Sequence, residues 1–281
     1  MTLDQIIAAL LYLVSVFILF FIGKLVYGLF NRRYSLKEEL VKKDNFALAL
    51  AVTGYYFGLI IALGGVLASE SDGLMIDLIE IFFYGIISIL LLNLSVYIND
   101  KVILSKFDNE KEIIEDQNAG TGIVEAANHI AIGMVIYGAM SGDYGGWITA
   151  GVFWILGQAV LIIASIVYRR ILPFDLHAEI EKDNVAVGVA FAGVLIAIGN
   201  IVRIGASGDF ISWEYNLTTF FGFVLFGLIL LPVLRFATDK VLLPGEKLTD
   251  ELVNQEKPNV GAAAIEAFSY IGASFLVGWV I

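Results

Sequence analysis

The amino-acid sequence predicts an all-α, polytopic membrane protein whose eight transmembrane helices form two pseudo-symmetric four-helix halves. Three observations support this fold class: long apolar blocks, basic residues restricted to alternate connections, and an internal repeat. The chain of 281 residues is 59% hydrophobic and 16% charged, with a mean hydropathy of +0.84. A soluble core of this size does not require apolar sequence in such long runs.

Each crossing of a hydrocarbon core about 30 Å thick needs about 20 mostly apolar residues. The sequence contains eight such blocks. The first is not expected to be a cleaved signal peptide, because it is too long and lacks a basic start. The blocks span Leu3 to Phe30, Asn45 to Ala68, Leu74 to Ile98, Asn118 to Met140, Trp147 to Tyr168, Asn184 to Ala206, Trp213 to Leu234 and Asn259 to Ile281.

The eight blocks alternate between two compositions. The odd-numbered blocks are rich in Phe, Leu and Ile, as in "VSVFILFFIG" and "TTFFGFVLFGLILL". The even-numbered blocks carry closely spaced Gly and Ala, as in "TGYYFGLIIALGG" and "NVGAAAIEAFSYIGAS". Small residues let helix backbones approach closely in lipid, where no hydrophobic drive brings helices together. We therefore expect the four small-residue helices to pack centrally and the four bulky ones to face lipid.

The basic residues indicate how the chain is oriented. If the helices alternate in direction, the connections 31–44, 99–117, 168–183 and 235–258 share one side, and they contain 15 of the 17 Lys and Arg residues. The connections on the opposite side, 69–73, 141–146 and 207–212, contain none. Short cytoplasmic loops concentrate Lys and Arg. The sequence therefore predicts four cytoplasmic connections, with the N-terminus and the C-terminus on the non-cytoplasmic side.

The second half of the sequence repeats the first. "DNFALALAVTG" at 44–54 returns as "DNVAVGVAFAG" at 183–193, and "DKVIL" at 100–104 returns as "DKVLL" at 239–243. "VEAANHIAIG" at 124–133 returns as "IEAFSYIGAS" at 265–274. We therefore expect a tandem duplication with two four-helix transmembrane units, residues 1–142 and 143–281.

A weaker repeat divides each half again into two helical hairpins. Each quarter contains a bulky helix, a cytoplasmic elbow with an acidic turn, and an Asn that opens a small-residue helix. Because every hairpin starts on the same side, the repeats are parallel rather than inverted, which favours a ring or a bundle. Asn is a preferred helix N-cap, and a ligand-facing ring at the cytoplasmic mouth is the alternative. The four residues are Asn45, Asn118, Asn184 and Asn259.

The acidic turn followed by Asn and a small-residue helix, twice in each half, resembles the YjfL-type bacterial inner-membrane family. The motifs "DNFALALAVTG" and "DNVAVGVAFAG" carry this resemblance, and it covers nearly all of the chain as two fused copies. The family is a domain family of unknown function. The resemblance implies a multi-pass protein of the cell inner membrane built from four-helix units, and it brings no catalytic residues to transfer.

Two acidic residues lie inside predicted membrane helices. Glu125 and Glu266 each follow their helix-opening Asn by seven residues, which is roughly 10 Å along a helix. An ionisable side chain at mid-membrane costs roughly 2.5 to 3.5 kcal/mol on insertion scales, and it normally faces a bundle interior or an aqueous cavity. We predict that the two acids approach each other near the pseudo-two-fold axis, where they would share a proton or hold a cation.

The neighbours of the two acids lie on the same helix faces. His129 stands one turn after Glu125 with Asn128 beside it, and Tyr270 stands one turn after Glu266. The alternative to a proton or ion site is structural, with Glu125 neutral or bonded to His129 and joining helices. A transition metal is disfavoured because the membrane blocks offer a single His. Since the counterpart of His129 is a Tyr, we expect proton chemistry in the first half.

Two further polar residues leave alternatives open. Arg203 lies near the outer end of a predicted helix. There it can snorkel to the headgroups, pair with Asp209 or Glu214, or form an electrostatic gate for an outer vestibule. His177 lies in a cytoplasmic elbow, where we expect a solvated surface position.

Several functional classes lack support in the sequence. It contains no Gly-rich phosphate loop, no HExxH, GxSxG or EF-hand pattern, and no Cys. Thiol redox chemistry and Cys-ligated metals are therefore excluded, and neither a cofactor nor an enzymatic activity is expected. The cytoplasmic connections carry 18 acidic against 15 basic residues, a balance that disfavours nucleic-acid binding.

Two functional hypotheses follow from these residues. The first is a channel-like or transporter-like protein for a cation or a proton. The second is a non-transporting membrane scaffold, alone or as a homo-oligomer, whose acidic elbows dock a cytoplasmic protein. In the second hypothesis the apolar elbow residues would face the membrane surface or that partner. These residues are Leu36, Leu40, Ile113, Leu176, Ile180, Leu248 and Leu252.

Overall fold

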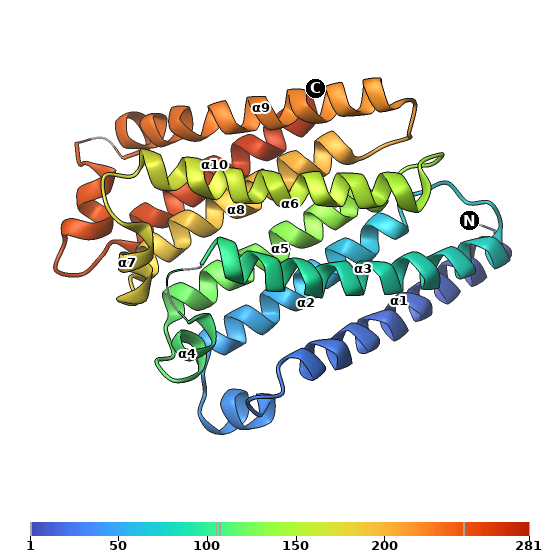
Figure 1. Ribbon diagram of the computed structural model, residues 1–281, viewed down its shortest axis with the longest axis horizontal. Helices are drawn as coiled ribbons and strands as arrows, with labels where there is room; N and C mark the ends of the chain where they lie inside the picture. The colour runs from blue at the N-terminus through green and yellow to red at the C-terminus, as the bar shows by residue number, and fades with distance from the viewer. Residues whose placement is uncertain (1, 105, 107, 244, 281) are drawn as a thin grey trace.

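A computed structural model describes residues 2–104, 106, 108–243 and 245–280. Met1, the first residue of the first predicted unit, and Ile281, the last residue of the second, lie outside the described residues. Within the described ranges the chain is helical and has no strands (Figure 1). Eight of these helices are long and apolar enough to cross a membrane. The predicted all-α class with eight candidate membrane helices is therefore confirmed.

The eight long helices follow the predicted blocks closely. The bulky helices are α1 (Leu3–Phe30), α3 (Leu74–Val102), α6 (Gly146–Ile171) and α9 (Trp213–Ala237). The small-residue helices are α2 (Phe46–Val66), α5 (Ala119–Met140), α8 (Val185–Ala206) and α10 (Val260–Val280). The elbows between them contain the short helices α4 (Asn109–Ile114) and α7 (Leu176–Glu181), and the π-helical turns η1 (Glu38–Lys42), η2 (Thr238–Leu242) and η3 (Asp250–Asn254).

Three bulky helices continue past their predicted ends. α3, α6 and α9 each extend by about a turn beyond the apolar block into the elbow, and η2 follows α9 directly. The residues there, such as Asn99, Asp100 and Lys101 in α3, are too polar for lipid but compatible with a helix. Because of this extension, polar side chains near the ends of α3 and α9 lie beside the small-residue helices α5 and α10.

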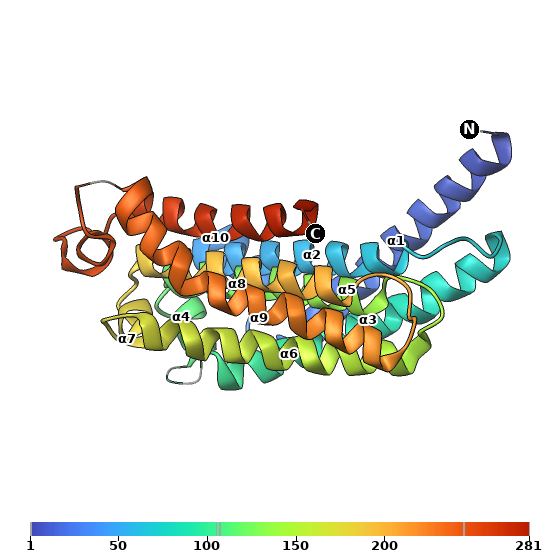
Figure 2. The ribbon, with the colours of Figure 1, turned by 90° about the horizontal axis from the view of Figure 1, so that it is seen from above.

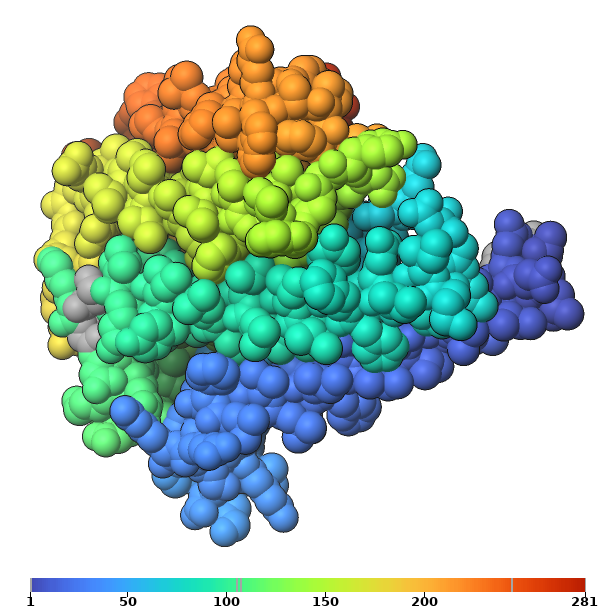
Figure 3. Space-filling model, turned by 45° about the vertical axis from the view of Figure 1, so that its right-hand side comes forward, coloured from blue at the N-terminus to red at the C-terminus, as the bar shows by residue number. Residues whose placement is uncertain are grey.

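The small-residue helices form one layer in the order α2, α5, α8 and α10. The bulky helices α3 and α6 lie along one face of this layer, whereas α1 and α9 cross it obliquely (Figure 2). The arrangement is an open row rather than a closed ring. The expected central position holds for α5 and α8, where 72% and 83% of the most apolar segment is buried, but less so for α10, with 39%. α1 lies at the other end of the molecule, and its N-terminal part projects beyond the rest (Figure 3).

Glycines permit the close spacing of the small-residue layer. A Cβ atom on Gly58 of α2 would collide with the carbonyl oxygen of His129 in α5. A Cβ atom on Gly199 of α8 would lie 2.7 Å from the Cα atom of Ala131 in α5. Such backbone approach maximises van der Waals contact, which is a main attraction between helices in lipid.

Each helix of this layer begins at one of the four asparagines. The Oδ1 atom of each Asn accepts a hydrogen bond from the backbone N–H three residues later, so all four are N-caps. The side-chain amide of the first three also donates to a carbonyl of the next elbow. Hence the four N-termini lie on one side of the membrane, called here the elbow side, and the four helices run parallel. The bonds join Asn45 to Ile113, Asn118 to Ile180 and Asn184 to Leu252, at 2.8 to 2.9 Å.

The apolar residues of the elbows pack into the molecule. Ile113, Leu176, Ile180, Leu248 and Leu252 are all buried, and Leu36 and Leu40 pack against the same core. They therefore face neither the membrane surface nor a docked partner. The elbow helices are too short to be stable alone, so their apolar faces fold back onto the ends of the long helices.

His177 in α7 is likewise buried, and the expected solvated position is wrong. Its Nε2 atom lies 2.8 Å from the carbonyl oxygen of Ile103, to which it donates. Burial is the main cause that lowers the pKa of His177, and the bond to Ile103 opposes it. The neutral ring is therefore favoured in the folded protein.

Candidate functional site

The first-half site is built around Glu125 of α5, which is 4% exposed. Its Oε1 atom accepts a hydrogen bond from Nδ2 of Asn109, the first residue of α4, at 3.0 Å. The carboxyl group of Asp100, near the end of α3, lies within hydrogen-bonding reach of Glu125. Throughout the described chain, no Lys or Arg side chain forms an ion pair with either carboxyl group. Two carboxyl groups thus meet without a neutralising base.

His129 approaches the same acid from one turn further along α5. Its Nδ1 atom donates to the carbonyl oxygen of Ala51 at 3.1 Å, so the neutral ring carries its lone pair on Nε2. Nε2 lies 3.9 Å from Oε2 of Glu125 and has no hydrogen-bond partner. The Tyr55 ring meets the imidazole edge-on, with ring centres 5.7 Å apart. The unpartnered nitrogen of a buried side chain therefore points at the carboxyl pair.

A cavity of about 800 Å³ leads to this cluster from the elbow side. Asp100 and Asn109 line it, together with Tyr27, Tyr34 and Tyr55. Burial is the main cause that raises the pKa of Tyr34 to about 12. Tyr34 therefore remains a hydroxyl donor at neutral pH. The cavity wall also carries Arg33, Lys101 and Lys106, but none of these bases forms an ion pair with Asp100 or Glu125.

The site is closed toward the opposite side of the membrane. From His129 to Met140, about 16 Å along the helix, α5 carries apolar and small side chains apart from Tyr137, and Ile132, Val135 and Ile136 are fully buried. A second cavity of about 320 Å³ begins beyond this segment, near Met140. The structure therefore connects the carboxyl pair to the elbow side and seals it from the other.

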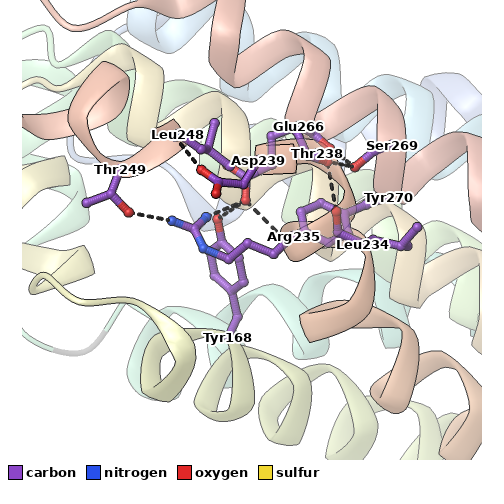
Figure 4. Close-up of polar contacts among 10 residues, drawn as sticks. All are labelled: Tyr168, Leu234, Arg235, Thr238, Asp239, Leu248, Thr249, Glu266, Ser269 and Tyr270. Atoms are coloured by element: carbon purple, nitrogen blue, oxygen red, sulfur yellow. Dashed lines mark hydrogen bonds and ion pairs between the residues drawn. The ribbon is translucent and has the colours of Figure 1, made fainter. Parts of the chain in front are cut away.

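The second-half acid, Glu266 of α10, has a different set of partners (Figure 4). Its Oε1 atom accepts from Nη1 of Arg235 in α9 at 2.5 Å, from the Tyr270 hydroxyl at 3.1 Å and from the Tyr168 hydroxyl at 3.3 Å. The Arg235 guanidinium also donates to Thr249. Glu266 is thus neutralised by a base supplied from the chain itself.

A polar pair beside each acid shows that the two sites are structurally equivalent. In the first half, Nδ2 of Asn99 donates to Oδ1 of Asn128 at 2.8 Å. In the second half, Oγ1 of Thr238 donates to Oγ of Ser269 at 2.9 Å. Asn99 and Thr238 occupy the same position in the repeat, as do Asn128 and Ser269. The differences between the two sites can therefore be compared position by position.

Two positions distinguish the sites. Arg235 has Val96 as its counterpart in the first half. Asp239, the counterpart of Asp100, turns toward the elbow and accepts from the Leu248 backbone (Figure 4). It also pairs with Lys240. In the second half, therefore, Glu266 has a guanidinium beside it and no second carboxyl group. In the first half, Glu125 has a second carboxyl group beside it and no guanidinium.

Glu125 and Glu266 do not form the pair that the sequence suggested. α8 lies between α5 and α10 in the row, and the hydrogen-bond partners of the two acids have no residue in common. The expectation rested on a closed bundle with a central axis, and an open layer has no such meeting point. Each acid belongs to its own site.

Arg203 on α8 takes none of the expected ionic partners among the described residues. Its Nε atom donates to Oδ1 of Asn200 at 2.9 Å, and its guanidinium carbon lies 5.5 Å from the ring centre of Tyr137. Such a cation over an aromatic ring is attracted by the ring quadrupole. Asp209 instead accepts from the Asp143 backbone, so an Arg203–Asp209 pair is not formed.

Sequence reasoning missed Asp100, Asn109 and Arg235. Their polarity assigned them to the cytoplasmic elbows, although α3 and α9 remain helical at Asp100 and Arg235. The repeated "DKVIL" and "DKVLL" segments marked the Asp positions. The exchange of Val96 for Arg235 between the halves was the signal that the two sites had diverged.

The described residues contain no group of three or more His, Cys, Asp or Glu side chains placed to hold a metal ion. A metal centre built by acidic and imidazole ligands alone does not fit this part of the chain.

Comparison with known proteins gives the family. The family model described as "Domain of Unknown Function (DUF350)" matches residues 1–140 and, a second time, residues 143–281. The chain belongs to this family. The two matches confirm the resemblance to a membrane domain of unknown function present in two tandem copies.

A curated member of similar length is the "UPF0719 transmembrane protein" of Aquifex aeolicus (strain VF5). It is 24% identical over 275 residues, which cover 94% of this chain and 97% of the relative. No solved structure matches. The chain is therefore an integral membrane protein of a family without an assigned activity, and its functional interpretation depends on its own residues.

Proposed function

We propose that this chain is a non-enzymatic, channel-like or transporter-like protein of the bacterial inner membrane that carries a proton or a small cation. Its site is the carboxyl pair of Asp100 and Glu125 in the first half. The elbow side is cytoplasmic, because the connections there contain 15 of the 17 Lys and Arg residues. Both termini then lie on the non-cytoplasmic side.

The observation that carries this proposal is that no Lys or Arg side chain among the described residues pairs with the carboxyl groups of Asp100 and Glu125. Buried ionisable groups within a membrane normally pair with one another or line a substrate pathway. Glu266 follows the first pattern through Arg235, and Glu125 follows the second, since Asp100 and Asn109 beside it open onto the 800 Å³ cavity. A positive ligand entering from the cytoplasm would supply the charge that the chain omits.

The structure then represents a state open to the cytoplasm and closed to the outside. The fully buried side chains of Ile132, Val135 and Ile136 form the closure. Transport requires this segment of α5 to separate from its neighbours in a second state. The smaller cavity near Met140, which carries Glu70, Asp72 and Glu80 on its wall, would be the exit on the outer side.

The test is ion and proton flux in proteoliposomes under imposed gradients. Asp100→Asn and Glu125→Gln should reduce flux to the level of empty vesicles. Asp239→Asn changes the repeat-equivalent residue to Asp100, which faces the elbow, and should retain most of the flux. If the parent protein conducts no more than empty vesicles under any gradient, or if Asp100→Asn and Asp239→Asn are indistinguishable, the proposal fails.

The scaffold alternative needs a docking surface on the elbows. Leu176, Ile180, Leu248 and Leu252 of the elbows are buried. The remaining elbow surface combines exposed ion pairs, such as Arg33 with Glu110 and Lys106 with Asp175, with the exposed side chains of Val41 and Val241. A partner would have to recognise this charge pattern. Charge reversal at Glu110 and Lys106 that abolishes a cellular function, while Glu125→Gln leaves it intact, would favour the scaffold.

A further inference from the structure

The duplicated halves allow the ligand of the first site to be deduced from the second. At equivalent positions the second half places one guanidinium beside one carboxylate, and turns the other carboxylate, Asp239, away to Lys240. The first half places Asp100 beside Glu125 and has Val96 where the guanidinium stem begins. The first half therefore lacks the positive charge that Arg235 provides in the second half, because Val96 occupies the equivalent position.

We propose that the first site holds one proton, shared between the carboxyl oxygens of Asp100 and Glu125, with His129 Nε2 as the adjacent acceptor. The inference rests on the proposed site and names its ligand. One proton leaves the pair with a single negative charge delocalised over two groups, which avoids the cost of two ionised carboxylates in a low-dielectric site. It also converts one carboxyl oxygen into a donor, so that the pair can form a direct O–H···O hydrogen bond.

The geometry favours a proton over a metal cation. Asp100 and Glu125 lie within direct hydrogen-bonding reach, whereas Ca²⁺ takes six to eight oxygens and Mg²⁺ requires an octahedron. The described chain brings no third acidic or imidazole ligand into that set. The amide nitrogen of Asn109 donates to Glu125, and the buried Oδ1 atoms of Asn109 and Asp100 have no hydrogen-bond partner. Asp100 Oδ1 can therefore accept the shared proton.

His129 supplies the second, independent observation. The side chain is 2% exposed, its Nε2 atom has no partner, and that atom lies 3.9 Å from Glu125. If the gap closes by about 1 Å to hydrogen-bonding distance, the Glu125 proton can pass to Nε2. This leaves a carboxylate and an imidazolium whose Nδ1–H stays bonded to Ala51. Both carboxyl groups are then ionised, and a second proton taken up from the elbow-side cavity, which Asp100 lines, restores the singly protonated pair.

The other ionisable groups around the pair come from α1, α3 and the first two elbows. Tyr27 of α1 and Tyr34 after it approach Glu125 closely enough to interact with its charge. Lys101 acts on Asp100 from the next position on α3 and is exposed. Glu110 lies further out and pairs with Arg33, and Glu39 in η1 pairs with Lys43. None of these bases forms an ion pair with the two buried carboxyl groups.

The proton can be observed directly by infrared difference spectroscopy of the full chain in lipid vesicles, because a protonated carboxyl group has a carbonyl band that a carboxylate lacks. At neutral pH the parent protein should show such a band. Glu125→Gln and Asp100→Asn should each lose it, and Asp239→Asn should keep it. Val96→Arg places a guanidinium at the position equivalent to Arg235. This variant should also lose the carbonyl band, because the new guanidinium neutralises Glu125.

Each outcome decides the proposal. A parent protein without the band, or a band that survives both Glu125→Gln and Asp100→Asn, overturns it. A band that disappears at constant pH when NaCl, KCl, MgCl₂ or CaCl₂ is added at matched ionic strength assigns the site to a metal cation instead. If Val96→Arg does not fold, the first two variants still decide. A band without flux in proteoliposomes contradicts transport alone, and flux without a band contradicts the shared proton alone.

Discussion

The Arg235–Glu266 pair gives a stability prediction that the structure makes quantitative. Arg235→Met removes the guanidinium but keeps an unbranched apolar side chain, so Glu266, which is 0% exposed, loses its base. Removing one partner of a buried ion pair costs about 3–5 kcal/mol, because a buried charge is left uncompensated. At about 1.4 kcal/mol per factor of ten, the folding equilibrium should shift by roughly two to four powers of ten.

The double variant Arg235→Met, Glu266→Gln separates this effect from lost packing. The Gln side chain is neutral and can still accept from the hydroxyl groups of Tyr168 and Tyr270. Replacing both partners of a buried pair is often nearly neutral, so most of the lost stability should return. Val96→Met, at the equivalent position of the first half, is the matched control and should cost less than about 1 kcal/mol.

The assay is reversible unfolding in bicelles. The free energy of unfolding is measured for the parent, the single variants Arg235→Met and Glu266→Gln, the double variant and the control Val96→Met. The coupling energy of the double-mutant cycle isolates the pair. A single Arg235→Met cost below about 1 kcal/mol, or a double variant whose loss equals the sum of the two single losses, would refute the argument that Arg235 neutralises Glu266.

Three further predictions test the fold. Gly58→Ala should destabilise the protein by about 1–3 kcal/mol in unfolding measurements, because its Cβ would collide with the His129 carbonyl oxygen. Asn118→Ala should cost about 2–3 kcal/mol and Asn259→Ala about 1 kcal/mol, since Asn118 also bonds the next elbow. The lowered pKa of His177 stabilises the protein above about pH 6.5; this contribution is lost as the pH falls, and His177→Asn should flatten the stability profile between pH 7.5 and about 5.5.

The helices could be predicted because each is specified by its own residues. Hydropathy defined the blocks, and Asn at the start of each small-residue helix defined its first turn, since a cap acts within three residues. The alternation of small and bulky compositions also predicted which helices pack closely, as Gly58 and Gly199 do. None of this information depends on how the four hairpins are placed relative to one another.

The arrangement of the hairpins could not be predicted in the same way. An open row and a closed bundle bury the same small-residue faces between neighbouring helices, so composition does not distinguish them. The assignment of Glu125 and Glu266 to one axis failed for this reason. Asp100 and Arg235 were missed because hydropathy marks where lipid ends, whereas α3 and α9 end later.

The asparagine bonds that align α2, α5, α8 and α10 also align their dipoles. Each helix carries the equivalent of about half a positive charge at its N-terminus, and the four N-termini lie together on the elbow side. Acidic side chains stand at these ends, and Glu112 and Glu251 accept directly from Asn118 and Asn259. The four bulky helices run in the opposite direction, so their dipoles oppose those of the small-residue layer. A membrane potential therefore acts on the two sets of helices in opposite senses, by at most roughly 5 kcal/mol per 100 mV on each. The force on the whole molecule nearly cancels, whereas the force between the two sets changes with the potential.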